Sequence, residues 1–451
     1  MKALPYLVAA ALALFSAHPA SLAQSPKAAA DAVRQQVRAR AEAELPTLLE
    51  LYKHLHANPE LSIMEEKTAA RISAELRKAG FTVTEKIGGH GVVGVLRNGP
   101  GKTVLVRTDL DALPVTETTG LPYASKVRTK DWDGNEVGTM HACGHDVHMT
   151  SFIGTARTLA AIKDRWAGTL VFIGQPAEEK VGGAKLMLAD GLFTRFPRPD
   201  YCLALHVASD LPAGTVGFTE GFMLANSDSM DILVRGVGGH GAWPHTTKDP
   251  IVLAAQIILA LQTVVSRETP AIEPAVVTVG SIHGGTKHNI IPEEVRLQLT
   301  LRSYSDTVRD NTIASIKRIT RGLGLAAGLP EDKLPVVTVQ EEGAKATYND
   351  PALTQRVVRA FNAWIGEGSV LKRQPVMGAE DFGLYGRTEH KVPICMFWLG
   401  TISSEVVNAS LRTGRSLPSL HSSLYAPQPE PSIRTGVTAM SAAVLELLGK
   451  P

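Results

Sequence analysis

The chain has 451 residues, of which 44% are hydrophobic, and this length is enough for two or three domains with large cores. Its 46 Lys and Arg residues nearly balance its 44 Asp and Glu residues, which leaves a formal net charge of +2. So small a charge supplies no broad positive field to attract nucleic acid or acidic lipid. The composition therefore disfavours a nucleic-acid-binding protein and indicates an ordinary globular one.

The first residues have the features of a secretory signal peptide. Lys2 precedes a largely apolar stretch from Leu7 to Phe15, and Ser21-Leu22-Ala23 has the small residues of a cleavage site. The apolar stretch is shorter than the roughly 20 residues that cross a bilayer, which makes a membrane anchor the weaker alternative. We expect residues 1–23 to be removed on export, which leaves a periplasmic or secreted protein without a membrane span.

The chain has three cysteines, and this odd number leaves at least one thiol unpaired in an exported protein. Cys202 and Cys395 lie in apolar, strand-like runs, which favours two buried thiols over a disulfide between them. Metal ligation by the third cysteine, Cys143, would explain why its thiol remains unpaired.

The first part of the chain alternates between helical and strand-like patterns. Gly80 marks the end of one helix, because a left-handed cap is expected there. The alternation predicts an α/β domain in which a central mixed sheet is flanked by helices on both faces. The patterns predict helices at 31–58, 65–79, 147–162 and 183–189, and strands at 91–97, 103–108, 169–173 and 201–206.

From about Met223 the pattern changes. We therefore expect an inserted α+β domain at 223–340, and a discontinuous first domain made of residues 24–222 and 341–451. The first sheet is expected to resume near Tyr348. Within the insertion the patterns predict a strand through Gly236, a helix at 251–265, strands at 275–282 and 295–303, and a helix at 306–323.

Polar residues gather where the predicted strands end. Asp109 and Asp111 follow one strand, residues 175–179 follow another, and His206 closes a third. Open α/β sheets bind ligands at the carboxyl ends of their strands, so these separate segments are expected to converge on one edge.

The segment His141-Ala142-Cys143-Gly144-His145-Asp146 concentrates metal-binding side chains in six residues. Further ligands must come from elsewhere, and the candidates are Glu178 or Glu179, His206 and His421. Sulfur, nitrogen and oxygen donors together suit zinc, manganese, cobalt or nickel better than magnesium or calcium. Five protein ligands exceed the need of one tetrahedral ion, which favours a pair of divalent ions about 3.5–4 Å apart.

The adjacent acids Glu178 and Glu179 indicate hydrolysis. Metallohydrolases need one carboxylate to hold the metal and a second to take a proton from the attacking water. On spacing alone either glutamate can fill either role. A lone histidine at a strand end is commonly structural, and a Glu-Glu pair is commonly solvated, but together these motifs favour a catalytic metal site.

These motifs resemble the two-metal aminoacylase and carboxypeptidase-G-type peptidases, in the amidohydrolase branch that holds hippurate hydrolases and plant indole-3-acetyl-amino-acid hydrolases. The similarity runs from about residue 45 to the C-terminus. It is carried by the segments Arg107-Thr108-Asp109-Leu110-Asp111-Ala112-Leu113-Pro114, 140–145, Gln175-Pro176-Ala177-Glu178-Glu179, Gly239-His240, His288-Asn289-Ile290-Ile291-Pro292, Gly378-Ala379-Glu380-Asp381-Phe382 and Leu420-His421.

The resemblance implies roles for individual residues. Many relatives outside this branch have His-x-Asp where this chain has Arg107-Thr108-Asp109. Arg107 therefore cannot be a metal ligand, and Asp109 is expected at most to contact the ligands without binding the metal itself. The resemblance makes Glu178 the general base, and it implies metal ligation by Cys143, His145, Glu179, His206 and His421.

The inserted domain corresponds, in this resemblance, to a lid that also forms dimers. The family's lid histidine reaches the active site of the partner subunit and helps to polarise the scissile carbonyl, a role that falls on His240. Asn289 and Arg302 are expected to face the substrate carboxylate, although Arg302 could equally be a surface ion-pair partner. Where the family has Gly-His-Ala-Ala, this chain has Gly239-His240-Gly241-Ala242-Trp243, which adds an aromatic near the substrate entrance.

The sequence thus predicts an amidohydrolase that cleaves N-acyl amino acids, using two divalent metal ions, a metal-activated water and Glu178. We expect a homodimer or larger homo-oligomer that acts on a small-molecule substrate. A dipeptidase or carboxypeptidase of the same family is the first alternative, because it would share every catalytic residue. A non-catalytic exported protein that binds metal or peptide is the second, and a redox thiol protein is disfavoured because no Cys-x-x-Cys pair exists.

Overall fold

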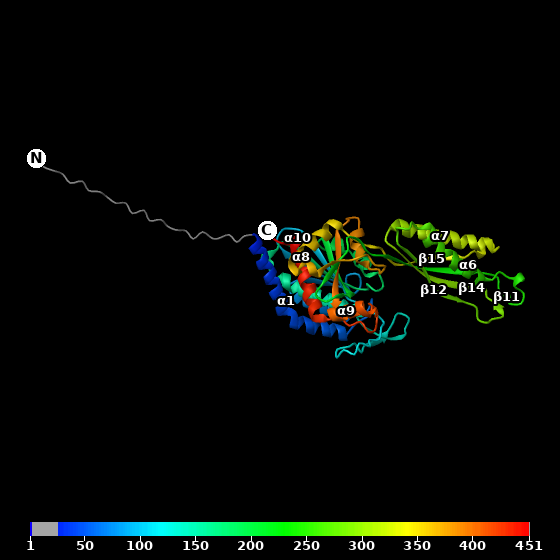
Figure 1. Cartoon of the computed structure of the whole chain (residues 1–451), viewed down its shortest axis with the longest axis horizontal. Helices are drawn as coiled ribbons and strands as arrows, with labels where there is room; N and C mark the ends of the chain where they lie inside the picture. The colour runs from blue at the N-terminus through cyan, green and yellow to red at the C-terminus, as the bar shows by residue number, and fades with distance from the viewer. Residues whose placement is uncertain (2–25, 451) are drawn as a thin grey trace.

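The structure is a computed structural model that describes Met1 and residues 26–450. The expected signal peptide, residues 1–23, lies outside the described residues apart from Met1. Figure 1 shows a broad α/β body that carries both ends of the described chain, and a narrower body that projects from it. We call the broad body the catalytic body and the narrower one the lid.

The catalytic body is built on a sheet of eight strands, and the sheet is mixed, as the sequence predicts. Its strands, in spatial order, are β1 (Thr82–Glu85), β2 (Val92–Asn98), β6 (Gly168–Gln175), β3 (Thr103–Asp109), β7 (Tyr201–Pro212), β18 (Ile394–Ile402), β8 (Val216–Phe218) and β17 (Val370–Lys372). Strands β6, β3, β7 and β18 run parallel to one another, whereas β2 and β8 run antiparallel to β6 and β18. The parallel strands place their carboxyl ends at one edge.

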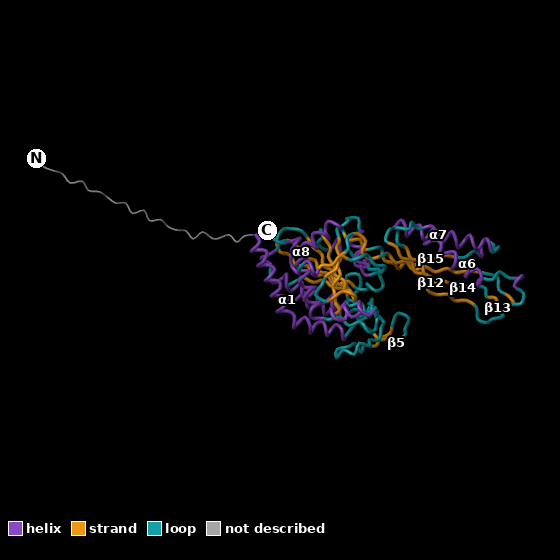
Figure 2. Tube along the Cα trace, in the orientation of Figure 1, coloured by secondary structure: helices purple, strands orange, loops and turns teal. Residues whose placement is uncertain are grey.

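Helices pack on both faces of this sheet, and Figure 2 shows them around the central strands. On one face Phe152 and Val437 pack in a core with Phe172, and on the other Met187 and Phe193 pack with Ile173. The first face carries α1 (Pro26–Ala57), α2 (Glu66–Lys78), α3 (His145–Ala161), α8 (Pro351–Ile365) and α10 (Pro429–Leu448), and the second carries α4 (Gly183–Ala189) and α5 (Leu192–Arg195). A further helix, α9 (Ser404–Thr413), contacts β7, and β4 (Arg128–Lys130) and β5 (Glu136–Gly138) form a separate hairpin.

The lid contains a four-stranded antiparallel sheet and two helices. Burial alternates along β14 (Glu294–Ser303), so that Leu297 and Leu299 face the helices while Arg296 and Gln298 are exposed. The sheet order is β12 (Ala275–Gly284), β14 (Glu294–Ser303), β10 (Asn226–Arg235) and β15 (Val336–Ala344), and the helices are α6 (Pro250–Thr263) and α7 (Asp306–Ala326). At the far end of the lid, β11 (Gly239–His240) pairs with β13 (Ile290–Ile291).

One described helix, Pro250–Glu268, is long and apolar enough by length and composition to cross a membrane. It comprises α6 and the turn that follows, and its Leu253, Ile257 and Leu261 are buried in the lid core. Part of its apolar surface is thus used for packing on the lid sheet.

The main sheet does not resume near Tyr348, and that expectation is wrong. Residues Thr347–Asn349 form β16, which pairs with β9 (Gly221–Leu224) in a separate two-stranded ribbon where the chain enters and leaves the lid. Asp350 then caps α8 by accepting the backbone N–H of Leu353 at 2.7 Å, so the helix begins before a longer strand can form. The main sheet resumes only with β17 at Val370.

Candidate metal centre and active site

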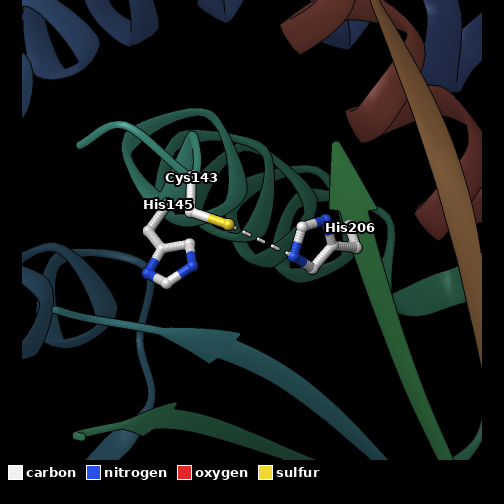
Figure 3. A group of neighbouring side chains, drawn as sticks. All are labelled: Cys143, His145 and His206. Atoms are coloured by element: carbon white, nitrogen blue, oxygen red, sulfur yellow. Dashed lines mark hydrogen bonds between the residues drawn. The ribbon is translucent and has the colours of Figure 1, made fainter. Parts of the chain in front are cut away.

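The carboxyl edge of the catalytic sheet brings the predicted metal ligands together. Cys143 and His145 lie where α3 begins, His206 lies in β7, and Glu179 follows β6. Figure 3 shows the Cys143 side chain pointing toward His206, with 3.7 Å between Sγ and Nε2, and His145 beside them. His421 comes from the loop before α10, and its Nε2 lies 3.6 Å from Glu179 Oε2.

The donor atoms form two groups that share Cys143. In the first group Cys143, His145 and His206 each place a donor atom within 4.8 Å of the others, and in the second Cys143, Glu179 and His421 do so. Two groups with one thiol in common suit two neighbouring ions better than one. The mixture of sulfur, nitrogen and oxygen donors fits borderline transition metals.

Gly144 lets the ligands on either side of it point to the same place. Its φ is 74°, in the left-handed region that favours glycine, and a Cβ added there would lie 2.7 Å from a methyl group of Val207. A larger residue would clash or would turn the backbone. Glycine is therefore required between the two predicted ligands Cys143 and His145.

Backbone carbonyl groups orient the rings of His145 and His206. The Nδ1 atom of His145 lies 2.7 Å from the carbonyl oxygen of Asp111, and Nδ1 of His206 lies 2.8 Å from that of Val207. A carbonyl oxygen only accepts, so each Nδ1 carries a proton and Nε2 is the ring atom left to bind a metal. Among the described residues, Nε2 of His145 and Oε1 of Glu179 are buried without a hydrogen-bond partner, which fits a bound ion as the missing partner.

Buried carboxyl groups give this edge an excess of negative charge. Burial by itself lowers the pKa of His145, but Asp109, Asp111 and then Glu179 raise it to about 10. Burial, followed by Glu380 and Glu179, raises the pKa of Glu178 well above its usual range. A place that stabilises an imidazolium and disfavours another carboxylate also stabilises a bound cation.

Asp109 contacts Arg107, His148 and the predicted ligand His145. Its Oδ2 is 2.7 Å from the guanidinium of Arg107 and 3.6 Å from Nε2 of His145. Its Oδ1 is 2.8 Å from Nδ1 of His148, and Nε2 of His148 accepts the backbone N–H of Val207 at 2.9 Å. Asp109 thus connects β3 to α3 and, through His148, to β7.

Four of the five predicted ligands, namely Cys143, Glu179, His206 and His421, line a pocket of about 470 Å³, a volume within the usual range of small-molecule sites. Leu224, Val376, Met377 and Trp398 give it an apolar wall, and none of these was predicted, because they come from separate segments without a common motif. Arg302 reaches the same pocket from the lid.

The three lid residues singled out in the sequence lie in different places. Arg302 lines the pocket, whereas His240 and Asn289 do not. The backbone N–H of Gly241 donates to the carbonyl oxygen of Asn289 at 2.9 Å. This bond keeps Asn289 next to the segment that contains His240. Figure 1 shows β11 at the end of the lid that is farthest from the catalytic body, so within one chain His240 and Asn289 lie away from the ligands.

Two groups of buried charged side chains were not predicted as parts of the site. The guanidinium of Arg107 lies 2.8 Å from Glu380. Glu380 belongs to one of the segments that resemble the family, but the sequence analysis assigned it no role. His56 lies between Asp146, at 2.7 Å, and Glu117, at 3.1 Å, and these carboxylates outweigh burial and raise its pKa to about 10. A single histidine near a helix end carries no sequence signal for such contacts.

Comparison with known proteins assigns the chain to a family. Residues 105–411 match Peptidase family M20/M25/M40. The chain belongs to this family. "Thermostable carboxypeptidase 2" of Saccharolobus solfataricus is 37% identical over 359 residues, which cover 78% of this chain and 86% of that protein. "Hippurate hydrolase" of Campylobacter jejuni is 38% identical over 336 residues, which cover 73% of this chain and 82% of that protein.

A solved structure supports the fold of this M20 peptidase family member. The YXEP protein of Bacillus subtilis, described as a dinuclear metal-binding peptidase of family M20, matches with a TM-score of 0.71 and 28% identity. The match covers 90% of this chain and 99% of that chain. The predicted family, the α/β fold class and the assignment to the hydrolases are therefore confirmed.

Thiol titration can test whether Cys143 is a metal ligand. Cys143 lines the pocket, whereas Cys202 and Cys395 are free but 0% and 1% exposed, as the sequence predicts for two buried thiols. We expect the native protein to show no reactive thiol with metal bound and one after treatment with a chelator. The Cys143→Ser variant should show no chelator-dependent thiol. A thiol that reacts equally with and without chelator, and disappears in that variant, would contradict ligation.

Proposed function

We propose that the protein hydrolyses the amide bond of N-acyl amino acids to release a carboxylic acid and a free amino acid. One observation supports this proposal: a single pocket is lined by Glu178, by four of the predicted ligands, by apolar side chains and by Arg302. An apolar wall suits an acyl group, and a guanidinium suits the carboxylate of an amino acid. Relatives described as "Hippurate hydrolase" and "N-acetylcysteine deacetylase" support this substrate class.

The donor set fits two divalent ions of zinc, manganese, cobalt or nickel, held by Cys143, His145, Glu179, His206 and His421. When bound, such ions activate the attacking water and polarise the scissile carbonyl group. Glu178 takes a proton from that water and returns it to the leaving nitrogen. The raised pKa of Glu178, caused first by burial, suits a group that must accept a proton and release it in one cycle.

A dipeptidase or carboxypeptidase is the second candidate, favoured by the relative described as "Thermostable carboxypeptidase 2". A dipeptide would bring a free α-ammonium group into the pocket. Among the described residues that line the pocket, the carboxylates are Glu178 and Glu179, and both are engaged in the metal site. The absence of a separate carboxylate there favours N-acyl substrates, and turnover of hippurate-like amides against simple dipeptides compares the two functions.

Glu178→Gln should abolish most turnover and leave the metal content unchanged. The substitution keeps the size of the side chain but removes the base, and general acid–base catalysis contributes about 10²–10⁴-fold to rates. Steady-state kinetics and metal analysis of the purified variant measure the two effects. Glu367→Gln, at an exposed position, is the matched control. Near wild-type turnover of metal-loaded Glu178→Gln would refute the role of Glu178.

Arg302→Met should raise KM for N-acyl amino acids. Arg302 is half-buried, and no carboxylate of residues 26–450 lies within 4.0 Å of its guanidinium, which leaves it available to a substrate. Loss of a charge-assisted hydrogen bond of about 1.5–3 kcal/mol predicts a rise of roughly tenfold or more. Amides that lack the carboxylate should show no change in KM. Arg296→Met, on the same face of β14, is the control, and an equal effect on both substrate types would contradict carboxylate binding.

We further propose that two chains associate through their lids, so that His240 of one chain serves the site of the other. His240 is exposed at the far end of the lid, away from the predicted metal ligands of its own chain. The helix α6 exposes Ile251, Val252 and Leu259, and β12 lies at the edge of the lid sheet. Exposed apolar side chains beside an open sheet edge are typical of an interface between subunits.

Mixing two inactive variants can test this arrangement. Neither His240→Ala nor Glu178→Gln should be active alone, but a hybrid dimer has one site that combines an intact Glu178 with an intact His240. After subunit exchange at equal amounts, activity should recover to about one quarter of wild type, because half of the dimers are hybrids with one intact site each. If His240 acts within its own chain, the mixture stays inactive.

A further inference from the structure

The loop that carries Glu178 and Glu179 has an unfavourable backbone conformation on both sides of the acid pair. Ala177 has a φ of 51° and Val181 a φ of 50°, in the left-handed region that residues with a Cβ rarely adopt. Such residues persist where the surroundings hold them, and they are common at functional sites. The contacts that hold this loop therefore help to determine where both carboxylates point.

Glu65 supplies one of these contacts from outside the pocket. Its Oε1 accepts the backbone N–H of Ala177 at 2.8 Å and that of Ile63, also at 2.8 Å. Ile63 is itself left-handed, with a φ of 70°. Glu65 is fully buried, directly before α2, and a single oxygen thus joins two strained segments that are far apart in the sequence.

Ser62 connects the same segment to the loop at a second point. Its hydroxyl donates to Oδ2 of Asp111 at 2.6 Å, and this oxygen also accepts the backbone N–H of Glu179 at 2.9 Å. The two connections reach the loop immediately before Glu178 and at Glu179. Residues 62–65 therefore hold the loop of Glu178 and Glu179 in place from the side away from the pocket.

The β4–β5 hairpin contacts residues 62–65 on the side opposite the catalytic loop. The indole N–H of Trp132 donates to the carbonyl oxygen of Ser62 at 3.1 Å. The ammonium group of Lys180, the residue after Glu179, lies 3.6 Å from the centre of the Trp132 ring, which is a cation–π contact. Residues 62–65 are thus held in place between the catalytic loop and the hairpin.

We propose that Glu65 is a positioning residue whose buried oxygen fixes the loop of Glu178 and Glu179, without contact to substrate or metal. This inference rests on the proposed function for the roles of the two acids. Burial, and then Asp111, raises the pKa of Glu65 to about 7, which disfavours its charged form. Both bonds to this oxygen come from backbone N–H groups, which need an acceptor oxygen and do not need a net negative charge.

Substitutions that separate the acceptor from the charge test the proposal. Glu65→Gln keeps an acceptor oxygen at the same reach, Glu65→Leu removes it, and Glu65→Asp keeps the charge but shortens the side chain. The first readout is Co²⁺ affinity of the metal-free protein, measured by competition with a chelator, because Glu179 is a predicted ligand. The second is the separate measurement of kcat and KM.

We expect Glu65→Gln to match wild type within about threefold in Co²⁺ affinity and kcat, whereas Glu65→Leu and Glu65→Asp lose about 10–100-fold in both, as is usual for groups that orient metal ligands. KM should change little, since Glu65 does not line the pocket. The matched control is Glu75→Leu, which removes another buried carboxyl group within α2, where Glu75 pairs with Arg157 at 2.6 Å. It should lower the unfolding temperature but preserve Co²⁺ affinity.

Wild-type Co²⁺ affinity and kcat in Glu65→Leu would overturn the proposal, as would an equal loss in Glu65→Gln or in the Glu75→Leu control. If Glu65→Leu does not fold, Glu65→Asp decides, because unchanged Co²⁺ affinity there would also overturn it. Failure of the wild-type enzyme to hydrolyse any N-acyl amino acid would contradict the proposed function alone. The Co²⁺ measurements would still decide the role of Glu65.

Discussion

The site is governed by an excess of buried negative charge at one edge of the catalytic sheet. Asp109, Asp111, Glu178, Glu380 and Asp381 are all buried there, and within residues 26–450 Arg107 is the one fully buried arginine or lysine. Its guanidinium contacts Asp109, Glu380 and Asp381, so three carboxyl groups share one cation, and Asp111 and Glu178 lie outside these contacts. Buried charges of one sign are strongly unfavourable unless they are paired or protonated. Bound cations satisfy this requirement, so metal binding and stability of this edge are coupled.

Regular elements and strained loops contribute to this edge in different ways. Parallel pairing of β3 and β6 places Asp109 beside Gln175, so the acids that follow these strands must meet. His145 and His206 are then held by backbone carbonyl groups, which do not titrate and which move little. Glu178 and His421, in contrast, lie in loops with left-handed residues, at Ala177 and at His421 itself, where φ is 68°. Such loops depend on side chains from other segments for their conformation.

The sequence predicts the parts of this arrangement that have a local pattern. The alternation of helices and strands indicates the sheet, and the His-Ala-Cys-Gly-His segment indicates the metal site, but the order of roles within Glu178 and Glu179 needed the family resemblance. Contacts between distant segments have no such pattern. Glu65 is 112 residues from its partner Ala177, and its position before a helix is typical of an exposed acid rather than a buried acceptor. The short ribbon of β9 and β16 was missed for a similar reason, because strand-like periodicity reports burial and not the identity of the neighbouring strand.

The junction between the two bodies divides the lid into a part near the pocket and a part far from it. The side-chain amide of Asn226, where β10 begins, donates to Ser303 Oγ at 2.8 Å and accepts the backbone N–H of Ser303 at 2.9 Å, which fixes the near ends of β10 and β14. Arg302 lies in this fixed part, whereas His240 lies at the opposite end. A rotation of the lid about the junction would therefore move His240 much farther than Arg302. Under the functions proposed for these two residues, such a motion would change the position of Arg302 at the pocket little and would mainly change where His240 lies.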